Sequence, residues 1–228
     1  MTRPTIVFDL DGTLVDTAPD LLDSLNYSLA HAGLPPVAEA ELRSYVGMGG
    51  KVMIQRAFAA RREPLSDERL AELLDVFLEH YTRNIPGKSL PWPGAVSALD
   101  RLERHGWLLA VCTNKYEALS QRLLTELGLA GRFGAICGQD TFAFRKPDPR
   151  HLILTIEAAG GDPGHALMVG DSRTDIDAAK AAGIPVVAVD FGYTDRHVRE
   201  FEPSRIISRF DELTLELAND LLRAVRAA

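Results

Sequence analysis

The sequence contains only two cysteines, Cys112 and Cys137, and they form no CxxC pair. Each lies near the end of an apolar run, so we expect two buried structural thiols in a reducing cytoplasm. No apolar stretch reaches the roughly 20 residues that a membrane span needs. The chain enters a predicted core strand almost at once, so we expect no signal peptide and a cytoplasmic location.

The chain also lacks a run of Lys or Arg that could follow a nucleic-acid backbone. The formal net charge is -7, which argues against nucleic acid or an anionic membrane as a partner. Internal repeats and low-complexity segments are absent. The 228 residues suffice for one large domain or two small ones, and the 46% hydrophobic content allows a sizeable core.

Short apolar runs that alternate with helical patterns are the main structural signal. The predicted strands are Thr5–Phe8, Trp107–Cys112, Phe133–Cys137, Ala166–Val169 and Pro185–Val189. The predicted helices between the later strands are Ala95–Arg104, Glu117–Leu127, Pro149–Ala159 and Asp175–Ala182, each followed by glycine. This alternation predicts an α/β fold in which helices cover both faces of a parallel sheet.

The long segment between the first two predicted strands carries no strand signal. Helical spacing occurs instead at Pro19–Ala32, Lys51–Arg61 and Asp67–Arg83. We therefore expect an α-helical domain at residues 17–90, inserted into an α/β core formed by residues 1–16 and 91–228. Because both joints fall next to the candidate site, we favour a mobile cap that excludes water, and the alternative is a purely structural subdomain.

Asp9 and Asp11 follow the first predicted strand and precede Gly12, which permits a sharp turn. Carboxylates two residues apart at a strand end project to the same side. Ligands of open α/β sheets bind at such strand ends. Two neighbouring acids repel each other unless a cation or a proton intervenes. The pattern indicates a metal site with one nucleophilic carboxylate and one free for proton transfer, and the alternative is a polar turn.

Polar side chains also follow the second and third predicted strands. Thr113 and Asn114 could donate hydrogen bonds to an anion near a helix start, although both residue types also serve as helix caps. Lys146 precedes a helix that begins near Pro149, where the helix dipole adds to its positive charge. A lysine in this position could hold a phosphate, and the alternative is a solvated loop lysine.

Two more acids, Asp171 and Asp175, follow the fourth predicted strand. They could complete an oxygen cage for a hard cation, and Mg²⁺ is the cation that needs few carboxylates. The alternative is that Thr174 or Asp175 caps the following helix. Arg173 could pair with this acid cluster, whereas the six histidines have no metal-ligand spacing.

Four segments of the chain, DLDGTLVDT, TNK, KPDP and GDSRTD, resemble the signature segments of the haloacid-dehalogenase superfamily of phosphohydrolases. They occur in the superfamily's order, and the resemblance covers nearly the whole chain. It implies a Rossmann-like parallel sheet core with an inserted α-helical cap. The aspartate at position 11 favours phosphatases or phosphomutases over the dehalogenases and transport ATPases of the superfamily.

The resemblance also implies a role for each candidate residue in catalysis and substrate binding. Asp9 would be the nucleophile that forms an aspartyl-phosphate intermediate. Asp11 would protonate the leaving alcohol and then deprotonate the attacking water. Thr113, Asn114 and Lys146 would bind the transferring phosphoryl group.

The metal that the resemblance implies is Mg²⁺. Its expected ligands are Asp9, the backbone carbonyl of Asp11, and Asp171, with Asp175 close behind. The charges of Mg²⁺ and Lys146 would offset the repulsion between a phosphate dianion and a carboxylate.

Further segments resemble bacterial phosphoglycolate phosphatases in particular. They are Tyr45–Gly50, Asn114-Lys115, Val186–Thr194 and Glu202–Leu213. This resemblance implies a small-molecule phosphomonoester as the partner, a monomer or homodimer, and hydrolysis of 2-phosphoglycolate to glycolate and phosphate. The glycines at 47, 49 and 50 allow a close backbone approach to a ligand.

Several alternatives remain open at this point. The enzyme could hydrolyse another small phosphate, such as a sugar phosphate or pyrophosphate, or it could be a sugar phosphomutase. Lys51 could serve a phosphonate-cleaving enzyme through a Schiff base if its pKa were lowered. Lys51 and Arg56 could instead bind a substrate carboxylate, or form only surface charge on a helix. A non-catalytic phospholigand-binding protein would have no use for Asp11.

Overall fold

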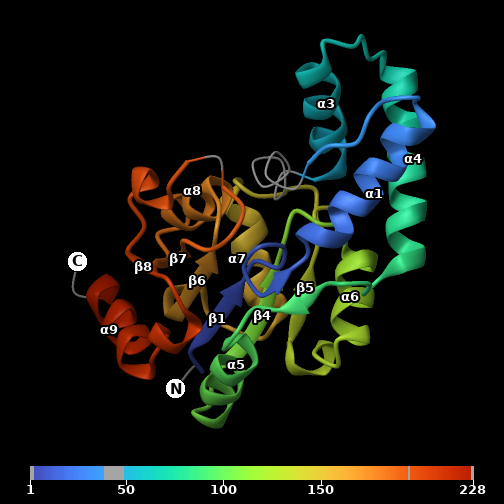
Figure 1. Cartoon of the computed structure of the whole chain (residues 1–228). Helices are drawn as coiled ribbons and strands as arrows, with labels where there is room; N and C mark the ends of the chain where they lie inside the picture. The colour runs from blue at the N-terminus through green and yellow to red at the C-terminus, as the bar shows by residue number, and fades with distance from the viewer. Residues whose placement is uncertain (1–2, 39–48, 195, 227–228) are drawn as a thin grey trace.

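Six parallel strands form the central sheet of the computed structural model, which describes residues 3–38, 49–194 and 196–226. The strands are β1 (Thr5–Phe8), β4 (Leu108–Cys112), β5 (Ala135–Cys137), β6 (Ala166–Gly170), β7 (Val186–Val189) and β8 (Arg205–Ile207). Their order across the sheet is β5-β4-β1-β6-β7-β8 (Figure 1). The chain therefore changes direction across the sheet between β1 and β6, where open α/β sheets bind ligands.

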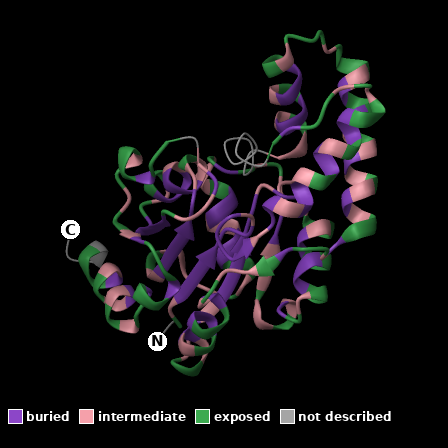
Figure 2. Ribbon diagram, in the orientation of Figure 1, coloured by how far each residue is buried: buried purple, intermediate pink, exposed green. Residues whose placement is uncertain are grey.

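Helices cover both faces of this sheet. One face packs against α7 (Pro149–Ala158) and α8 (Arg173–Ala181), and the other against α5 (Ala95–Arg104), α6 (Glu117–Glu126) and α9 (Leu215–Arg226). Successive residues of β1 alternate between the two layers, because Ile6 and Phe8 join one core cluster and Val7 joins the other. The four inner strands β4, β1, β6 and β7 are buried on both sides (Figure 2), which explains their unbroken apolar runs.

Of the described helices between β1 and β4, three form a separate layer beside the sheet, at the upper right of Figure 1. They are α1 (Ala18–His31), α3 (Gly50–Arg61) and α4 (Asp67–Asn84). Their shared core contains Leu25, Ile54, Leu73 and Phe77. The chain enters and leaves this layer through an antiparallel pair, β2 (Val15–Asp16) and β3 (Leu90–Pro91).

The predicted α/β fold with a parallel sheet and an inserted helical segment is confirmed. The predicted helices and strands differ from the observed ones by at most two residues at either end. The expectation of no strand between β1 and β4 was wrong, because β2 and β3 are there, but a strand of two residues has no periodicity to detect. Also unpredicted were β8, α9 and the 3₁₀ turns Ala130–Arg132, Pro163–His165, Val198–Phe201 and Phe210–Glu212.

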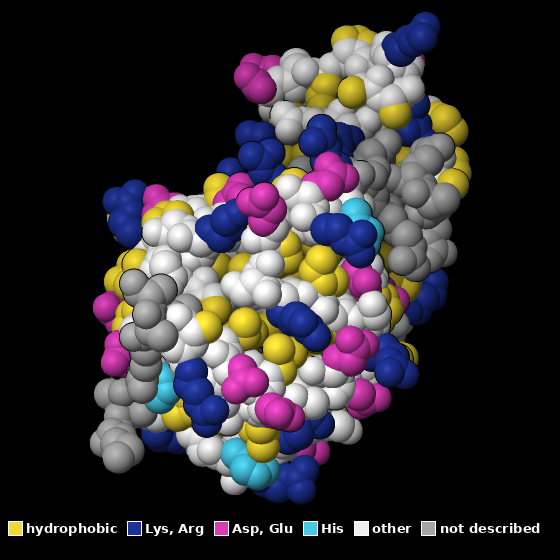
Figure 3. All heavy atoms as spheres, turned by 90° about the vertical axis from the view of Figure 1, so that its left-hand side faces the viewer, with side chains coloured by type: hydrophobic (Ala, Val, Ile, Leu, Met, Phe, Trp, Pro, Cys, Tyr) yellow, Lys and Arg dark blue, Asp and Glu magenta, His cyan; other side chains and the backbone are white. Residues whose placement is uncertain are grey.

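Cys112 and Cys137 are free and buried on the neighbouring strands β4 and β5, as expected. Burial raises the pKa of Cys112 to about 12, so the thiol is protonated at neutral pH. Within the described ranges, no helix is both long enough and apolar enough to cross a membrane. Lys and Arg side chains are interspersed with Asp and Glu on the face shown in Figure 3.

Candidate active site

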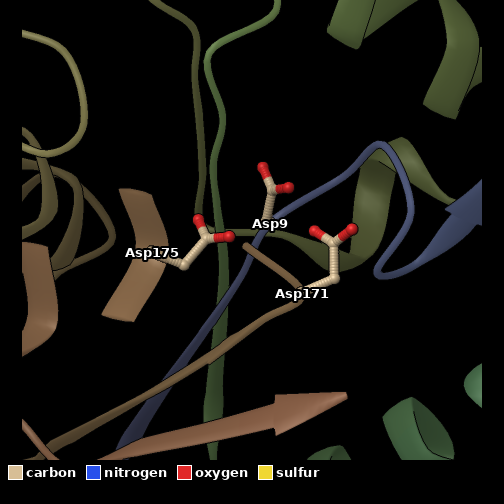
Figure 4. Close-up of side chains that lie close together, drawn as sticks. All are labelled: Asp9, Asp171 and Asp175. Atoms are coloured by element: carbon tan, nitrogen blue, oxygen red, sulfur yellow. The ribbon is translucent and has the colours of Figure 1, made fainter. Parts of the chain in front are cut away.

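Three buried aspartates meet where β1 and β6 end. Asp9 directly follows β1, Asp171 directly follows β6, and Asp175 lies in the first turn of α8. One carboxylate oxygen from each lies within 4.8 Å of the others. Asp171 and Asp175 lie on either side of Asp9 (Figure 4). The expected convergence of acids from separate strand ends is therefore what the structure shows.

Lys146, in the loop before α7, supplies positive charge to this cluster. Its Nζ donates to Asp9 Oδ1 at 2.7 Å and to Asp175 Oδ1 at 2.5 Å, and its side chain is 2% exposed. Burial alone would lower the pKa of Lys146, but Asp175 and Asp9 raise it well above its usual value. Lys146 is therefore a permanent cation beside the expected nucleophile.

The negative charge of the cluster exceeds what Lys146 can balance. Burial raises the pKa of Asp9 to about 6, against the lowering effect of Lys146. Burial, together with the charges of Asp9 and Asp175, raises the pKa of Asp171 well above its ordinary value. A buried set of carboxylate oxygens with surplus negative charge fits a hard divalent cation. The three acids can therefore hold a metal ion.

Hydrogen bonds fix the orientation of Asp171 and Asp175. Asp171 accepts from Thr13 Oγ1 at 3.2 Å and from the Tyr193 backbone N at 2.6 Å. Asp175 Oδ2 accepts from the backbone N of Ser172 at 3.0 Å and from its Oγ at 2.6 Å. The N-cap residue of α8 is Ser172 rather than Thr174 or Asp175, but Asp175 takes part in the capping as the third residue of a capping box.

Glycine backbone surrounds the acids. Gly12 has φ of 86°, and a Cβ atom there would overlap Asp171 Oδ2 and lie 2.7 Å from the Tyr193 ring. A Cβ on Gly192 would overlap the Asp171 side chain, and one on Gly170 would overlap Asp175. These positions require glycine because a larger residue would displace a carboxylate.

Asp11 is placed differently from the three clustered acids. Its carboxylate accepts from Lys115 Nζ at 3.0 Å and 3.2 Å, and the Lys115 ammonium lies 4.2 Å from the centre of the Tyr81 ring. The side chain of Asp11 is thus held by a cation of its own. Only its backbone carbonyl was expected to bind metal, and the separate position of the side chain is compatible with that expectation.

The expected phosphoryl-binding residues lie beside the same site. Thr113 is buried after β4, and its Oγ1 accepts from the Lys115 backbone N at 3.2 Å. Asn114 Nδ2 donates to the Lys146 carbonyl at 3.1 Å and so ties two loops together. Asn114 Oδ1 is buried and finds no hydrogen-bond partner in the described part of the chain.

A cavity of about 150 Å³ joins these residues to the helical layer. From the sheet side it is lined by Asp9, Asp11, Thr113, Asn114, Lys115 and Lys146. From the helical side it is lined by Gly49, Gly50 and Lys51 at the start of α3, and by Phe77 and Tyr81 of α4. The cavity therefore lies between the inserted helices and the end of the sheet that carries Asp9 and Asp11.

The remaining sequence predictions have mixed outcomes. Lys51 lines the cavity, whereas Arg56 is not among the described residues that line it. The interpretation of Arg173 as a partner of the acid cluster was wrong, because its Nε donates to Asp177 at 3.0 Å within α8. A partner four residues along the same helix faces the same side and is nearer to Arg173 than the acid cluster is. The segment 45–48 lies outside the described residues.

Four contacts in the site involve residues to which the sequence analysis assigned no role. They involve Thr13, Tyr81, Lys115 and Tyr193. Thr13, Lys115 and Tyr193 do stand in segments that carried the resemblance, so the signal was present without an assigned role. Tyr81 had only helical spacing, which is typical of any core position.

Comparisons with known proteins agree with this geometry. Residues 6–189 match the family model for haloacid dehalogenase-like hydrolases. The chain is 67% identical over 224 residues to a phosphoglycolate phosphatase of Mesorhizobium japonicum, which covers 98% of this chain and 99% of that one. It is 50% identical over 225 residues to a phosphoglycolate phosphatase of Agrobacterium fabrum, with 99% and 97% coverage.

A solved structure shows the same fold. The crystal structure of a predicted phosphoglycolate phosphatase from Haemophilus somnus superposes with a TM-score of 0.87 at 31% identity, covering 95% of this chain and 98% of that one. The chain therefore belongs to the haloacid dehalogenase-like hydrolases and is an enzyme. Within that family it is similar over nearly its full length to phosphoglycolate phosphatases.

Replacing Gly12 by Ala should destabilise the protein through the overlap with Asp171. We expect the free energy of unfolding to fall by about 2–4 kcal/mol, from overpacking together with positive-φ strain. Gly106→Ala is the matched control, because Gly106 has φ of 81° with nothing within 4 Å of the added atom. That variant should lose only about 1 kcal/mol in denaturant unfolding. Equal losses in both variants would contradict the close approach at Asp171.

Proposed function

We propose that the protein is a Mg²⁺-dependent phosphomonoesterase that acts through an aspartyl-phosphate at Asp9. The observation that carries this proposal is the buried Asp9 carboxylate held by Lys146 at the switch point of the sheet, with two further acids beside it. The substrate that we propose is 2-phosphoglycolate, which yields glycolate and phosphate. The similarity to phosphoglycolate phosphatases over nearly the whole chain supports this choice.

In this mechanism Asp9 attacks the phosphorus, and the bond from phosphorus to the ester oxygen breaks. Lys146 contacts Asp9 and would also neutralise charge on the transferring phosphoryl group. The Thr113 hydroxyl and the Asn114 side chain are the neighbouring polar groups that would orient that group. Covalent catalysis divides one difficult displacement into two easier ones.

Asp11 would perform the proton transfers. It lines the cavity, stands apart from the three clustered acids and is paired with Lys115, so its carboxyl group would face the leaving group rather than the metal. It would donate a proton to the ester oxygen of the leaving alcohol and later accept one from the water that attacks the phosphoryl group. The contact with Lys115 holds the Asp11 side chain in place between these steps.

Asp9, Asp171 and the Asp11 backbone carbonyl would hold Mg²⁺. When bound, Mg²⁺ would supply the positive charge that lets a phosphate dianion approach a carboxylate. Asp175 supports this arrangement from behind, because it accepts hydrogen bonds from Lys146 and Ser172 at the same time. The buried, surplus negative charge of the acids supports this assignment.

We also propose that residues 17–90 act as a cap over a core of residues 1–16 and 91–228. The paired strands β2 and β3 are the two connections between these parts. The cavity has one wall from each part, so a small change at the connections would open or close it. Closure would exclude water from the first phosphoryl transfer.

A panel of phosphate esters with Mg²⁺ and with EDTA tests the proposed function. We expect phosphate release to be fastest from 2-phosphoglycolate, to stop with EDTA and to be absent in Asp9→Asn. The panel would include hexose phosphates, a nucleotide, pyrophosphate and phosphonoacetaldehyde. Faster release from another ester would keep the mechanism and reject the substrate. Release that persists in Asp9→Asn would reject the nucleophile.

Replacing Lys146 by Ala should lower kcat by about 10²-fold or more, as does the loss of one oxyanion donor in other enzymes. The physical reason is that Asp9 and the phosphoryl group then lose their shared cation. Lys180→Ala, at an exposed lysine 3.4 Å from Glu202, is the matched control and should retain full turnover. Thermal unfolding should confirm that both variants are folded. Near-normal turnover of folded Lys146→Ala would refute the assigned role.

A further inference from the structure

Two hydrogen-bond donors from distant parts of the chain meet beside Asp11. Lys115 follows β4, and its ammonium lies 4.2 Å from the centre of the Tyr81 ring of α4. The Lys115 side chain is 5% exposed and Tyr81 is 1% exposed. The Tyr81 hydroxyl is buried and finds no hydrogen-bond acceptor within residues 3–38, 49–194 and 196–226. A buried donor without an acceptor is costly, so a native structure normally supplies a partner.

Both groups are donors at neutral pH. The Lys115 ammonium is paired with the Asp11 carboxylate at 3.0 Å, so it is a cation that can only donate. Burial raises the pKa of Tyr81 to about 12, so its hydroxyl keeps its proton. Asp11 occupies one side of the ammonium, which carries three N–H donors. The pair therefore has capacity for one further acceptor, and both residues line the cavity.

The length of the proposed substrate determines where its carboxylate must lie. In 2-phosphoglycolate a single CH₂ group separates the ester oxygen from the carboxylate carbon. The ester oxygen must lie within reach of Asp11, the proposed acid, so a carboxylate-binding group must adjoin Asp11. Lys115 contacts Asp11 directly at 3.0 Å. Lys51 is exposed at the start of α3, and no contact between it and Asp11 is seen among the described residues.

We infer that Lys115 and Tyr81 form the subsite for the carboxylate of a short phosphorylated hydroxy acid, an inference that rests on the proposed function. The ammonium of Lys115 and the hydroxyl of Tyr81 both donate to the substrate carboxylate, while Lys115 keeps its contact with Asp11. One donor belongs to the sheet side of the cavity and the other to the helical side. The subsite is therefore complete only when α4 lies against the sheet-side wall, which links substrate selection to closure.

The test compares kcat/KM for 2-phosphoglycolate with kcat/KM for 2-hydroxyethyl phosphate, which has the same length but no carboxylate. We expect Tyr81→Phe to lower the first value about tenfold and the second by at most about threefold, the loss of one hydrogen bond to a charged group. Lys115→Met should abolish the preference for the acid, and Lys115→Arg should restore part of it. Tyr27→Phe, at an exposed tyrosine stacked on His80, is the matched control and should change neither value.

Two results would overturn this assignment. Tyr81→Phe could lower both values equally, or Lys51→Met could abolish the preference while Lys115→Met left it intact. Because Lys115 is buried, Tyr81→Phe keeps the test decisive even if the lysine variants fail to fold.

Failure of the proposed function has a different signature, because the wild-type enzyme would then hydrolyse neither ester. In that case calorimetric titration of the Asp9→Asn protein with each ester decides the matter. Tighter binding of 2-phosphoglycolate that disappears on adding Tyr81→Phe would support the subsite. Equal binding of the two esters would reject it.

Discussion

The contact of the Lys146 ammonium with Asp9 and Asp175 is the interaction on which the site depends. Carboxylates that are buried so close together repel one another and cannot remain ionised without a compensating cation. Lys146 provides one positive charge between two of them, at 2.7 Å and 2.5 Å. The sheet brings the acids to one edge, and the loop before α7 brings the lysine to them. Removing that cation would leave charges without a partner in a dry environment.

The third acid, Asp171, is stabilised instead by Tyr193, which also contacts the segments that connect the sheet to the helical layer. Tyr193 donates its backbone N–H to Asp171, and its hydroxyl accepts from the Ala18 backbone N and donates to Asp16. Its ring packs at 6.4 Å from the ring of Trp92, which directly follows β3. The residue that orients Asp171 therefore also contacts both segments through which the chain enters and leaves the helices. A shift at this connection would therefore move Tyr193 and with it the carboxylate of Asp171.

A buried acid, Asp20, links the two ends of the helical layer near the same connection. Asp20 of α1 accepts from the backbone N of Lys88 at 2.8 Å, and from the backbone N and Oγ of Ser89 at 2.9 Å and 2.5 Å. The first helix of the layer is thereby bonded to the segment that leads out of it. The proposed cap movement would therefore have to occur with this bonded end moving as one piece, and the two-residue strands β2 and β3 provide the short connections for it.

Much of this arrangement could be predicted from the sequence because strand ends are encoded locally. An apolar run followed by polar residues placed Asp9, Thr113 and Asp171 at one edge of the sheet, and the structure brings them to that edge. The contact of Lys115 with Tyr81 could not be found this way, because it joins α4 to the end of β4 and no local spacing encodes it. The partner of Arg173 was missed although it is local: Arg173 pairs with Asp177, four residues along the same helix, and not with the acid cluster.

The most direct test of the account is to trap the phosphorylated enzyme. The protein would be mixed with 2-phosphoglycolate and Mg²⁺, quenched in acid within one turnover, reduced with borohydride and analysed by peptide mass spectrometry. Borohydride converts an aspartyl-phosphate to homoserine, and we expect that conversion at Asp9 alone and only when substrate was present. Steady turnover without modification of Asp9, or modification at another acid such as Asp11, would contradict the central claim.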